Sequence, residues 1–209
     1  MVVNAAVTGF WPRLRYVFLT DGLLEWLDND QIAAVFGHEL AHVRHRHLWL
    51  RAAAMLIPLS LGLFVFYGFP GLVREGEIFA RSAGLNLDSW FAVPALVGMI
   101  AYVLTFFGFY SRCLEYEADL AACRSIPTDE GVLVFCSALE RLAAACGNRR
   151  SRTWQHGSIA RRVDFLESVR RAPELGLRFD RRVRLLGGIV IGLSLSPLIC
   201  LLVCSCLLG

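Results

Sequence analysis

Residues 28–47, DNDQIAAVFGHELAHVRHRH, predict a helix that carries four histidines and a glutamate toward its end. DNDQ is typical of a capping box, with Asp28 as the N-cap residue and Gln31 three positions later. At about 100° per residue, His38 and His42 lie about 40° apart on one helical face, one turn apart along the axis. Their imidazoles can therefore reach the same metal ion.

Glu39 lies beside that face, where its carboxylate can touch a water on the ion without binding the ion itself. This H-E-x-x-H arrangement is typical of zinc peptidases. Neutral imidazoles bind Zn²⁺, the ion lowers the pKa of its water to about 7, and the glutamate takes the proton and later delivers it to the leaving amine. The alternative interpretation is a solvated, histidine-rich helix end that contains H-E-x-x-H by chance.

The other two histidines of this stretch are expected to stand apart from the site. His47 lies about 180° from His38 around the helix and therefore faces away from any site that His38 and His42 build. His45 returns to the face of His38 but lies about 10 Å further along the axis. It can pair with His42 only if the site is shifted along the helix.

Hydrophobic runs indicate a membrane protein. Of the 209 residues, 56% are hydrophobic, and the mean hydropathy is +0.53. Apolar runs without charged residues predict spanning helices at about 52–73, 89–111 and 185–208, since about 20 apolar residues suffice to cross a bilayer. We therefore expect a mainly α-helical, multi-pass fold, with a small strand element near the N-terminus. Three buried helices of a soluble protein are the alternative.

The arginines predict how the chain is oriented. All 21 basic residues are arginine, and the loop from Arg74 to Asp88 holds two of them, whereas 1–51 and 112–184 hold the rest. The positive-inside rule therefore predicts that 1–51 and 112–184 face the cytoplasm. Because the arginines are interspersed with acidic residues, we expect no nucleic acid as a partner.

A third ligand is expected in SRCLEYEADLAA, residues 111–122, directly after the second run. Glu115 and Asp119 are four residues apart on one helical face, and Glu117 points the other way. One of the two carboxylates can complete a His₂Glu site and leave a position for water. The other can accept a hydrogen bond from a ligand histidine. A hairpin of spans would return this segment to the H-E-x-x-H helix; solvated helix surface is the alternative reading.

The order GHELAH, hydrophobic hairpin, SRCLEYEAD resembles the membrane zinc metallopeptidases that include HtpX and the CAAX prenyl protease. RYVFLTDGLLEWLDNDQIAAVFGHELAH also resembles the segment that precedes the motif in that family, and the likeness covers roughly residues 3–167. The resemblance implies a zincin-type helix pair and one Zn²⁺ per chain. It implies Glu115 as the third ligand and Asp119 as a residue that supports a ligand. Members of that family commonly carry one or two spans before this lead-in, whereas this sequence starts inside it, so we expect either a chain that lacks upstream spans or a minimal version.

Two weaker elements of the resemblance add candidate residues. WQHGSIARRV matches a histidine followed six residues later by arginine, which implies that His156 and Arg162 stabilise the oxyanion of the reaction. The family usually has His-Pro where this chain has His156-Gly157; the alternative for His156 is a surface histidine. The stretch NAAV resembles a strand that borders the cleft, which makes Asn4 a candidate substrate contact.

These observations predict a zinc endopeptidase in the cell membrane, with residues 1–209 as a single domain and the active site facing the cytoplasm. By resemblance, its expected partners are the lipid bilayer and polypeptide substrates, namely membrane or misfolded proteins. One alternative is a CAAX-type peptide protease, although the chain is short for the large chamber of those relatives. The other is a non-catalytic zinc scaffold or sensor, which would not need Glu39.

Overall fold

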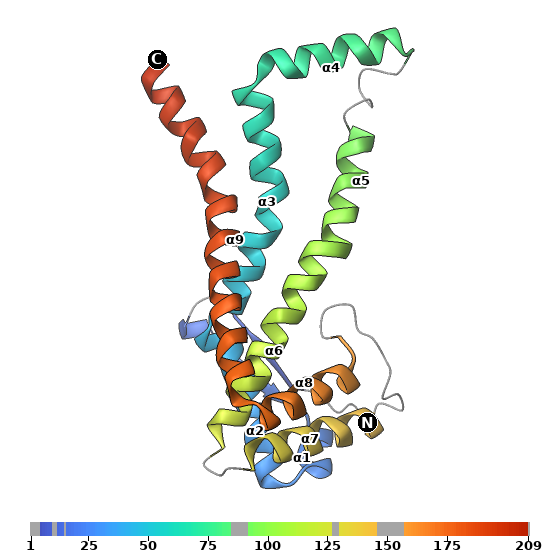
Figure 1. Cartoon of the computed structure of the whole chain (residues 1–209), viewed down its shortest axis with the longest axis vertical. Helices are drawn as coiled ribbons and strands as arrows, with labels where there is room; N and C mark the ends of the chain where they lie inside the picture. Colours follow the sequence, from blue (N-terminus) through green and yellow to red (C-terminus); the bar gives the residue numbers. More distant parts are fainter. Residues whose placement is uncertain are drawn as a thin grey trace. The chain divides into compact units, whose positions relative to one another are not determined.

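The computed structural model consists of helices and one small sheet (Figure 1). It describes residues 5–9, 12–14, 16–84, 92–126, 130–145 and 157–208. The described chain divides into two compact units, which are formed by 1–49 with 110–185 and by 50–109 with 186–209. The expected mainly helical fold with strands near the N-terminus is confirmed.

The first unit begins with a hairpin. Strand β1 (Ala5–Thr8) pairs antiparallel with β2 (Tyr16–Leu19) around the 3₁₀ turn η1 (Pro12–Leu14). Helix α1 (Asp21–Trp26) follows, and the hydroxyl of Thr20 accepts a hydrogen bond from the backbone N–H of Leu23 at its start. Leu23 is fully buried and joins α1 to the core of this unit.

Helix α2 (Asn29–Arg44) contains the H-E-x-x-H motif and has the predicted capping box. The backbone N–H of Gln31 donates to Asp28 at 2.9 Å, and that of Asp28 donates to the Gln31 side chain at 3.2 Å. The helix ends earlier than a continuous pattern would suggest. Arg46 has a φ of 58°, and a new helix, α3 (His47–Gly68), begins directly after it.

The remaining helices of this unit surround α2. Helix α2 packs against β1 and α7 (Gly131–Ala145), and α7 packs against α8 (Ile159–Arg171). The C-terminal part of α6 (Gly108–Ser125) belongs to the same apolar core. Gly37 brings α2 close to α6, because a β-carbon at that position would collide with Oγ of Ser125 and lie 3.3 Å from its Cβ. The two helices that carry the predicted ligands are thus neighbours.

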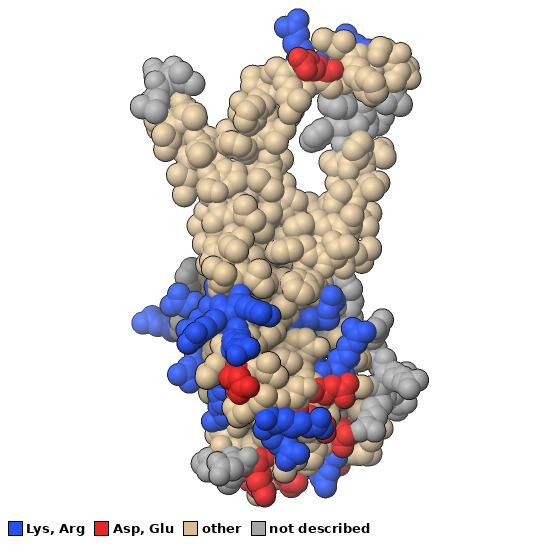
Figure 2. All heavy atoms as spheres, viewed as in Figure 1, with Lys and Arg blue, Asp and Glu red and all other residues tan. Residues whose placement is uncertain are grey.

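The second unit contains most of α3, α4 (Pro70–Ser82), α5 (Ala92–Tyr102), the π-helical turn η2 (Val103–Phe107) and the end of α9 (Pro173–Leu208). Tyr102 donates its hydroxyl to the carbonyl of Ala54 at 2.6 Å, and Ser60 donates to that of Leu193 at 3.3 Å. Such bonds to backbone carbonyls join apolar helices. Within this unit, the charged side chains of 52–84 all lie on α4 (Figure 2).

Within the part of the chain that the structure describes, three helical segments are long and apolar enough to cross a membrane: His47–Gly68, Ala92–Ser125 and Pro173–Cys206. They correspond to the three predicted runs, but the first ends at Gly68, before the expected limit of 73. The reason is Pro70, which disfavours helical backbone at the preceding residue. Phe69 accordingly has a φ of −132° and a ψ of 61°.

Candidate metal centre

The predicted ligands meet in the first unit. His38 and His42 on α2 and Glu115 on α6 offer ligand atoms that lie within 4.8 Å of one another. The Nε2 atoms of the two histidines are 3.1 Å apart, and each is 3.6 Å from a carboxylate oxygen of Glu115. A tetrahedral Zn²⁺ with bonds of about 2.0–2.1 Å separates its ligand atoms by about 3.4 Å. The spacing of these donors therefore fits such an ion.

One set of contacts orients His38. Its Nδ1 lies 2.9 Å from Oδ1 of Asp119, which is fully buried. Arg162 on α8 donates to both oxygens of Asp119, through Nε at 2.8 Å and through Nη2 at 2.5 Å. Phe135 on α7 stacks on the imidazole, with ring centroids 5.8 Å apart. These neighbours direct Nε2 of His38 toward the other two donors.

The electrostatics around His38 favour a positive charge. Burial by itself would lower the pKa of His38, because it disfavours the charged imidazolium. Hydrogen bonds to Asp119 and Glu115, together with the charge of Asp119, outweigh burial and the opposing charge of Arg162, so the pKa rises from 6.5 to about 9. The cluster thus stabilises the protonated, positively charged form of this imidazole.

A second set of contacts orients His42 and includes a residue that the sequence analysis directed elsewhere. Nδ1 of His42 lies 2.8 Å from Nδ1 of His47, and Nε2 of His47 lies 3.1 Å from Glu117. The prediction that His47 faces away is therefore wrong. It assumed a continuous helix, whereas the backbone turns at Arg46 and brings His47 back to the site.

Hydrogen bonding assigns the protons of this second set. If His42 presents the lone pair of Nε2 to an ion, its proton lies on Nδ1 and would be donated to Nδ1 of His47. His47 would then carry its own proton on Nε2 and donate it to Glu117. His45, whose Nδ1 is 3.2 Å from the same carboxylate, completes the group.

The other candidate residues differ in how far the structure describes them. Glu39 is partly buried on α2 between the two histidines. Arg162 reaches the site through Asp119, and its part in oxyanion binding stays a prediction. Asn4 and His156 lie outside the described residues. Gly157 has a φ of 72°, a backbone conformation that proline cannot adopt, so the local backbone differs from that of a chain with His-Pro.

Comparison with known proteins agrees with this arrangement. The model of peptidase family M48 matches residues 1–168. The chain belongs to that family. M48 peptidases are metallopeptidases, and the matched region contains both helices that supply the candidate ligands. No solved structure matches the chain.

Curated M48 relatives give the same result. A protease HtpX homolog of Thermoplasma acidophilum is 30% identical over 176 residues, which are 82% of this chain and 52% of the relative. One of Kineococcus radiotolerans is 34% identical over 147 residues, 68% of this chain and 47% of the relative. One of Desulforapulum autotrophicum is 32% identical over 145 residues, which are 66% of this chain and 44% of the relative. The chain thus spans about half the length of the curated relatives it matches.

Proposed function

We propose that this M48 protein is a zinc-dependent endopeptidase of the cell membrane, with Zn²⁺ bound by His38, His42 and Glu115. The observation that supports it most is the spacing of the three donors, 3.1 Å between the two Nε2 atoms and 3.6 Å from each to Glu115. Two neutral imidazoles and one carboxylate suit Zn²⁺, and a three-ligand set keeps one coordination position for water. Zn²⁺ in such a site supplies Lewis-acid activation of water.

The side chains of α2 perform the proton transfers in this proposal. Glu39 follows the first ligand histidine and is not one of the three donors, and we assign its carboxylate the role of general base. It accepts the proton of the attacking water and returns it to the leaving amine. Asp119 holds His38 in the tautomer that presents Nε2, and Arg162 keeps Asp119 charged and in place.

For the oxyanion, we propose His156 and Arg162, as the family resemblance implies. A guanidinium that binds Asp119 through two of its nitrogens still carries further N–H groups that can donate. Such donors lower the barrier when they point to where negative charge develops.

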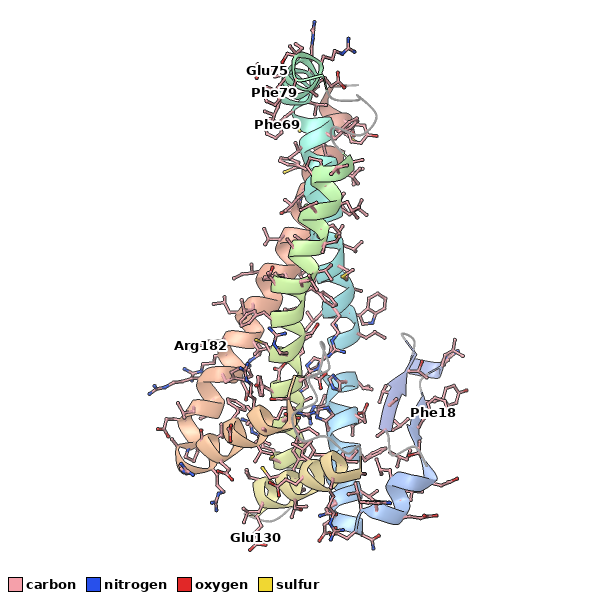
Figure 3. All side chains as sticks on the ribbon, turned by 90° about the vertical axis from the view of Figure 1, so that its right-hand side faces the viewer. Phe18, Phe69, Glu75, Phe79, Glu130 and Arg182 are labelled. Carbon is pink, nitrogen blue, oxygen red and sulfur yellow. The ribbon has the colours of Figure 1, made fainter. Side chains whose placement is uncertain are left out.

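We propose that the substrates are membrane or misfolded polypeptides. The hairpin supports an extended, apolar substrate, because Tyr16 and Phe18 on β2 are 58% and 57% exposed. Phe18 projects from the strand (Figure 3). Exposed aromatic side chains bind apolar segments, and a strand edge pairs with extended backbone. Asn4, adjacent to β1, is proposed to contact the substrate. The names of the relatives, protease HtpX homologs, agree with a general proteolytic role.

One variant separates the enzyme from a zinc scaffold. Glu39→Gln should retain zinc and fold while cleavage of an unfolded reporter in detergent falls about 10²–10⁴-fold, since it removes the general base. Metal content and cleavage would be measured on the same samples, with Glu140→Gln as a matched control on α7. A zinc-loaded wild-type chain that cleaves no unfolded or membrane polypeptide would favour the scaffold.

The proposed orientation has its own test. The arginine asymmetry supports a cytoplasmic active site, because the 74–88 segment is poor in arginine and 1–51 and 112–184 are rich in it. A cysteine introduced at Gly84, which is exposed, should react with a membrane-impermeant thiol reagent added to intact cells. A cysteine introduced at Glu130, which is also exposed, should react with the same reagent only after the cells are lysed. The reverse labelling would contradict the orientation.

A further inference from the structure

A second group of metal-binding side chains lies beside the first. His45, His47 and Glu117 offer ligand atoms within 4.8 Å of one another. Nδ1 of His45 is 3.2 Å from one oxygen of Glu117, and Nε2 of His47 is 3.1 Å from the other. We propose that these three residues form a second site for a divalent cation and that its occupation weakens the first site.

The chemistry of the donors indicates the class of cation. Two imidazoles and one carboxylate suit Zn²⁺ and similar borderline metals, whereas Mg²⁺ and Ca²⁺ prefer oxygen ligands. The observed separations of 3.1 and 3.2 Å are close to the distance of about 3.4 Å between ligands of a tetrahedral zinc ion. The set is thus equivalent in kind to the His₂Glu set of the first site.

Two of the three side chains in this group are buried, and the third is partly exposed to solvent. The side chains of His47 and Glu117 are 1% and 6% exposed, and that of His45 is 32% exposed. The buried carboxylate already faces two nitrogen donors, so no large rearrangement precedes binding. A cation can enter from the side of His45, where a water can also complete its coordination.

The backbone is shaped to bring these histidines together. Residues two apart on a continuous helix point about 200° from each other. Here α2 ends at Arg44, and Arg46 adopts a φ of 58°, which is unusual for a residue other than glycine. This left-handed conformation is unfavourable for a residue that has a β-carbon. Its effect is that His45 and His47 both reach Glu117.

The contact between His42 and His47 couples the two sites. When His42 binds an ion through Nε2, its Nδ1 carries a proton and donates it to Nδ1 of His47 over 2.8 Å. When His47 binds an ion through Nε2, its own proton must also be on Nδ1. Two N–H groups would then face each other at hydrogen-bond distance, and one imidazole has to turn away.

Binding at the two sites is therefore antagonistic. The second cation either displaces His42 from its orientation or binds less tightly while the first is present, and the effect is reciprocal. Loss of a partner that orients a ligand histidine typically costs about 10–100-fold in metal affinity or activity. We expect excess zinc to inhibit the protein. The inhibition, though not the binding, rests on the proposed peptidase function.

His45→Gln provides the test, because His45 contacts the second site alone and glutamine preserves a hydrogen-bond donor toward Glu117. The full chain in detergent would be dialysed against increasing free Zn²⁺, and bound metal would be counted by mass spectrometry. We expect wild-type protein to bind one and then a second equivalent, and the variant only one. His156→Gln, which removes a different histidine, should retain both.

Cleavage of an unfolded reporter at each zinc concentration completes the experiment. Relative to its own value at one equivalent, wild-type activity should fall about tenfold as the second equivalent binds, whereas the activity of His45→Gln should not fall as zinc rises. A single equivalent in wild-type protein at excess zinc, or a second equivalent that persists in His45→Gln, would overturn the second site. Inhibition that persists in His45→Gln would overturn the coupling. If no form cleaves the reporter, the metal counts still decide whether the site exists.

Discussion

The Nδ1 atoms of His42 and His47 lie 2.8 Å apart. His47, the first residue of α3, therefore supports the candidate ligand His42 near the end of α2. The candidate metal centre consequently has two sets of supporting residues. His38 is backed by Asp119 and Arg162, and His42 is backed by His47 and Glu117. Each ligand imidazole thus has a fixed partner for its second nitrogen.

The contact of His47 with His42 predicts a change in metal affinity. His47→Phe removes the acceptor for the Nδ1 proton of His42, so affinity for zinc at the His38–His42–Glu115 site should fall about 10–100-fold. His47→Asn can keep an acceptor oxygen near that proton and should lose less. Competition with a chromophoric zinc chelator measures both. Equal affinities in wild-type protein and His47→Phe would show that the contact does not orient His42.

The Asp119–Arg162 pair predicts a large effect on stability. Arg162→Met leaves the fully buried carboxylate of Asp119 without its bidentate partner, which typically costs about 3–5 kcal/mol of unfolding free energy. The control is Arg171→Met on the same helix, because Arg171 forms an exposed pair with Glu167, and such pairs contribute about 0.5 kcal/mol or less. Denaturant unfolding of the zinc-free protein in detergent compares the two. Similar losses would contradict the structural role of Arg162.

The raised pKa of His38 predicts how zinc binding depends on pH. Its pKa of about 9 means that a cation on Nε2 must displace a proton at neutral pH. Apparent zinc affinity should therefore increase about tenfold per pH unit as pH rises toward 9, and level off above it. The zinc-free fold has the opposite dependence. Protonated His38 stabilises it fully below about pH 6.5, and this contribution is lost as pH rises through about 9.

Asp119→Asn serves as the control for this pH dependence. It removes the charge that raises the pKa of His38, so the increase in zinc affinity should level off at a lower pH. Affinities measured by chelator competition between about pH 6.5 and 9 would reveal the shift. A wild-type affinity that is constant over this range would show that no proton is displaced from His38.

The left-handed backbone at Arg46 predicts a contrast between two substitutions. Arg46→Gly relieves a conformation that is costly for other residues, and the greater freedom of glycine in the unfolded chain offsets the gain, so stability should change by less than about 1 kcal/mol. Arg46→Val places a β-branched residue there and should destabilise by about 1–3 kcal/mol. Arg44→Val, at an exposed helical position, is the control. Equal effects of both valine substitutions would contradict the argument.

Local patterns predicted the parts of the site that depend on local geometry. Helical spacing paired His38 with His42, and the capping box located the start of α2. The apolar runs corresponded to the three long helices. Each of these features follows from residues that are close in sequence.

The remaining contacts depend on packing or on an unsignalled backbone conformation. The helix break at Arg46 contains no glycine or proline that would reveal it in the sequence. The assumption of a continuous helix therefore predicted the wrong position for the His47 side chain. The bond between Asp119 and Arg162 joins α6 to α8, and the stacking of Phe135 on His38 joins α7 to α2. The spacing of residues in the sequence predicts neither contact, because several arginines and phenylalanines could equally have been the partners.

The close packing of α2 on α6 at Gly37 predicts which size of ion the candidate His38–His42–Glu115 site would prefer. Ser125, which already donates to the carbonyl of Ala122 at 2.7 Å, fills the space that a side chain at 37 would need. An alanine there would push α2 from α6 and lengthen the distance from His38 and His42 to Glu115. The ionic radius that fits best would then increase, so Gly37→Ala should shift the ratio of Cd²⁺ to Zn²⁺ affinity toward the larger metal. Such a shift would make metal selectivity depend on the contact between two helices as well as on the ligands themselves.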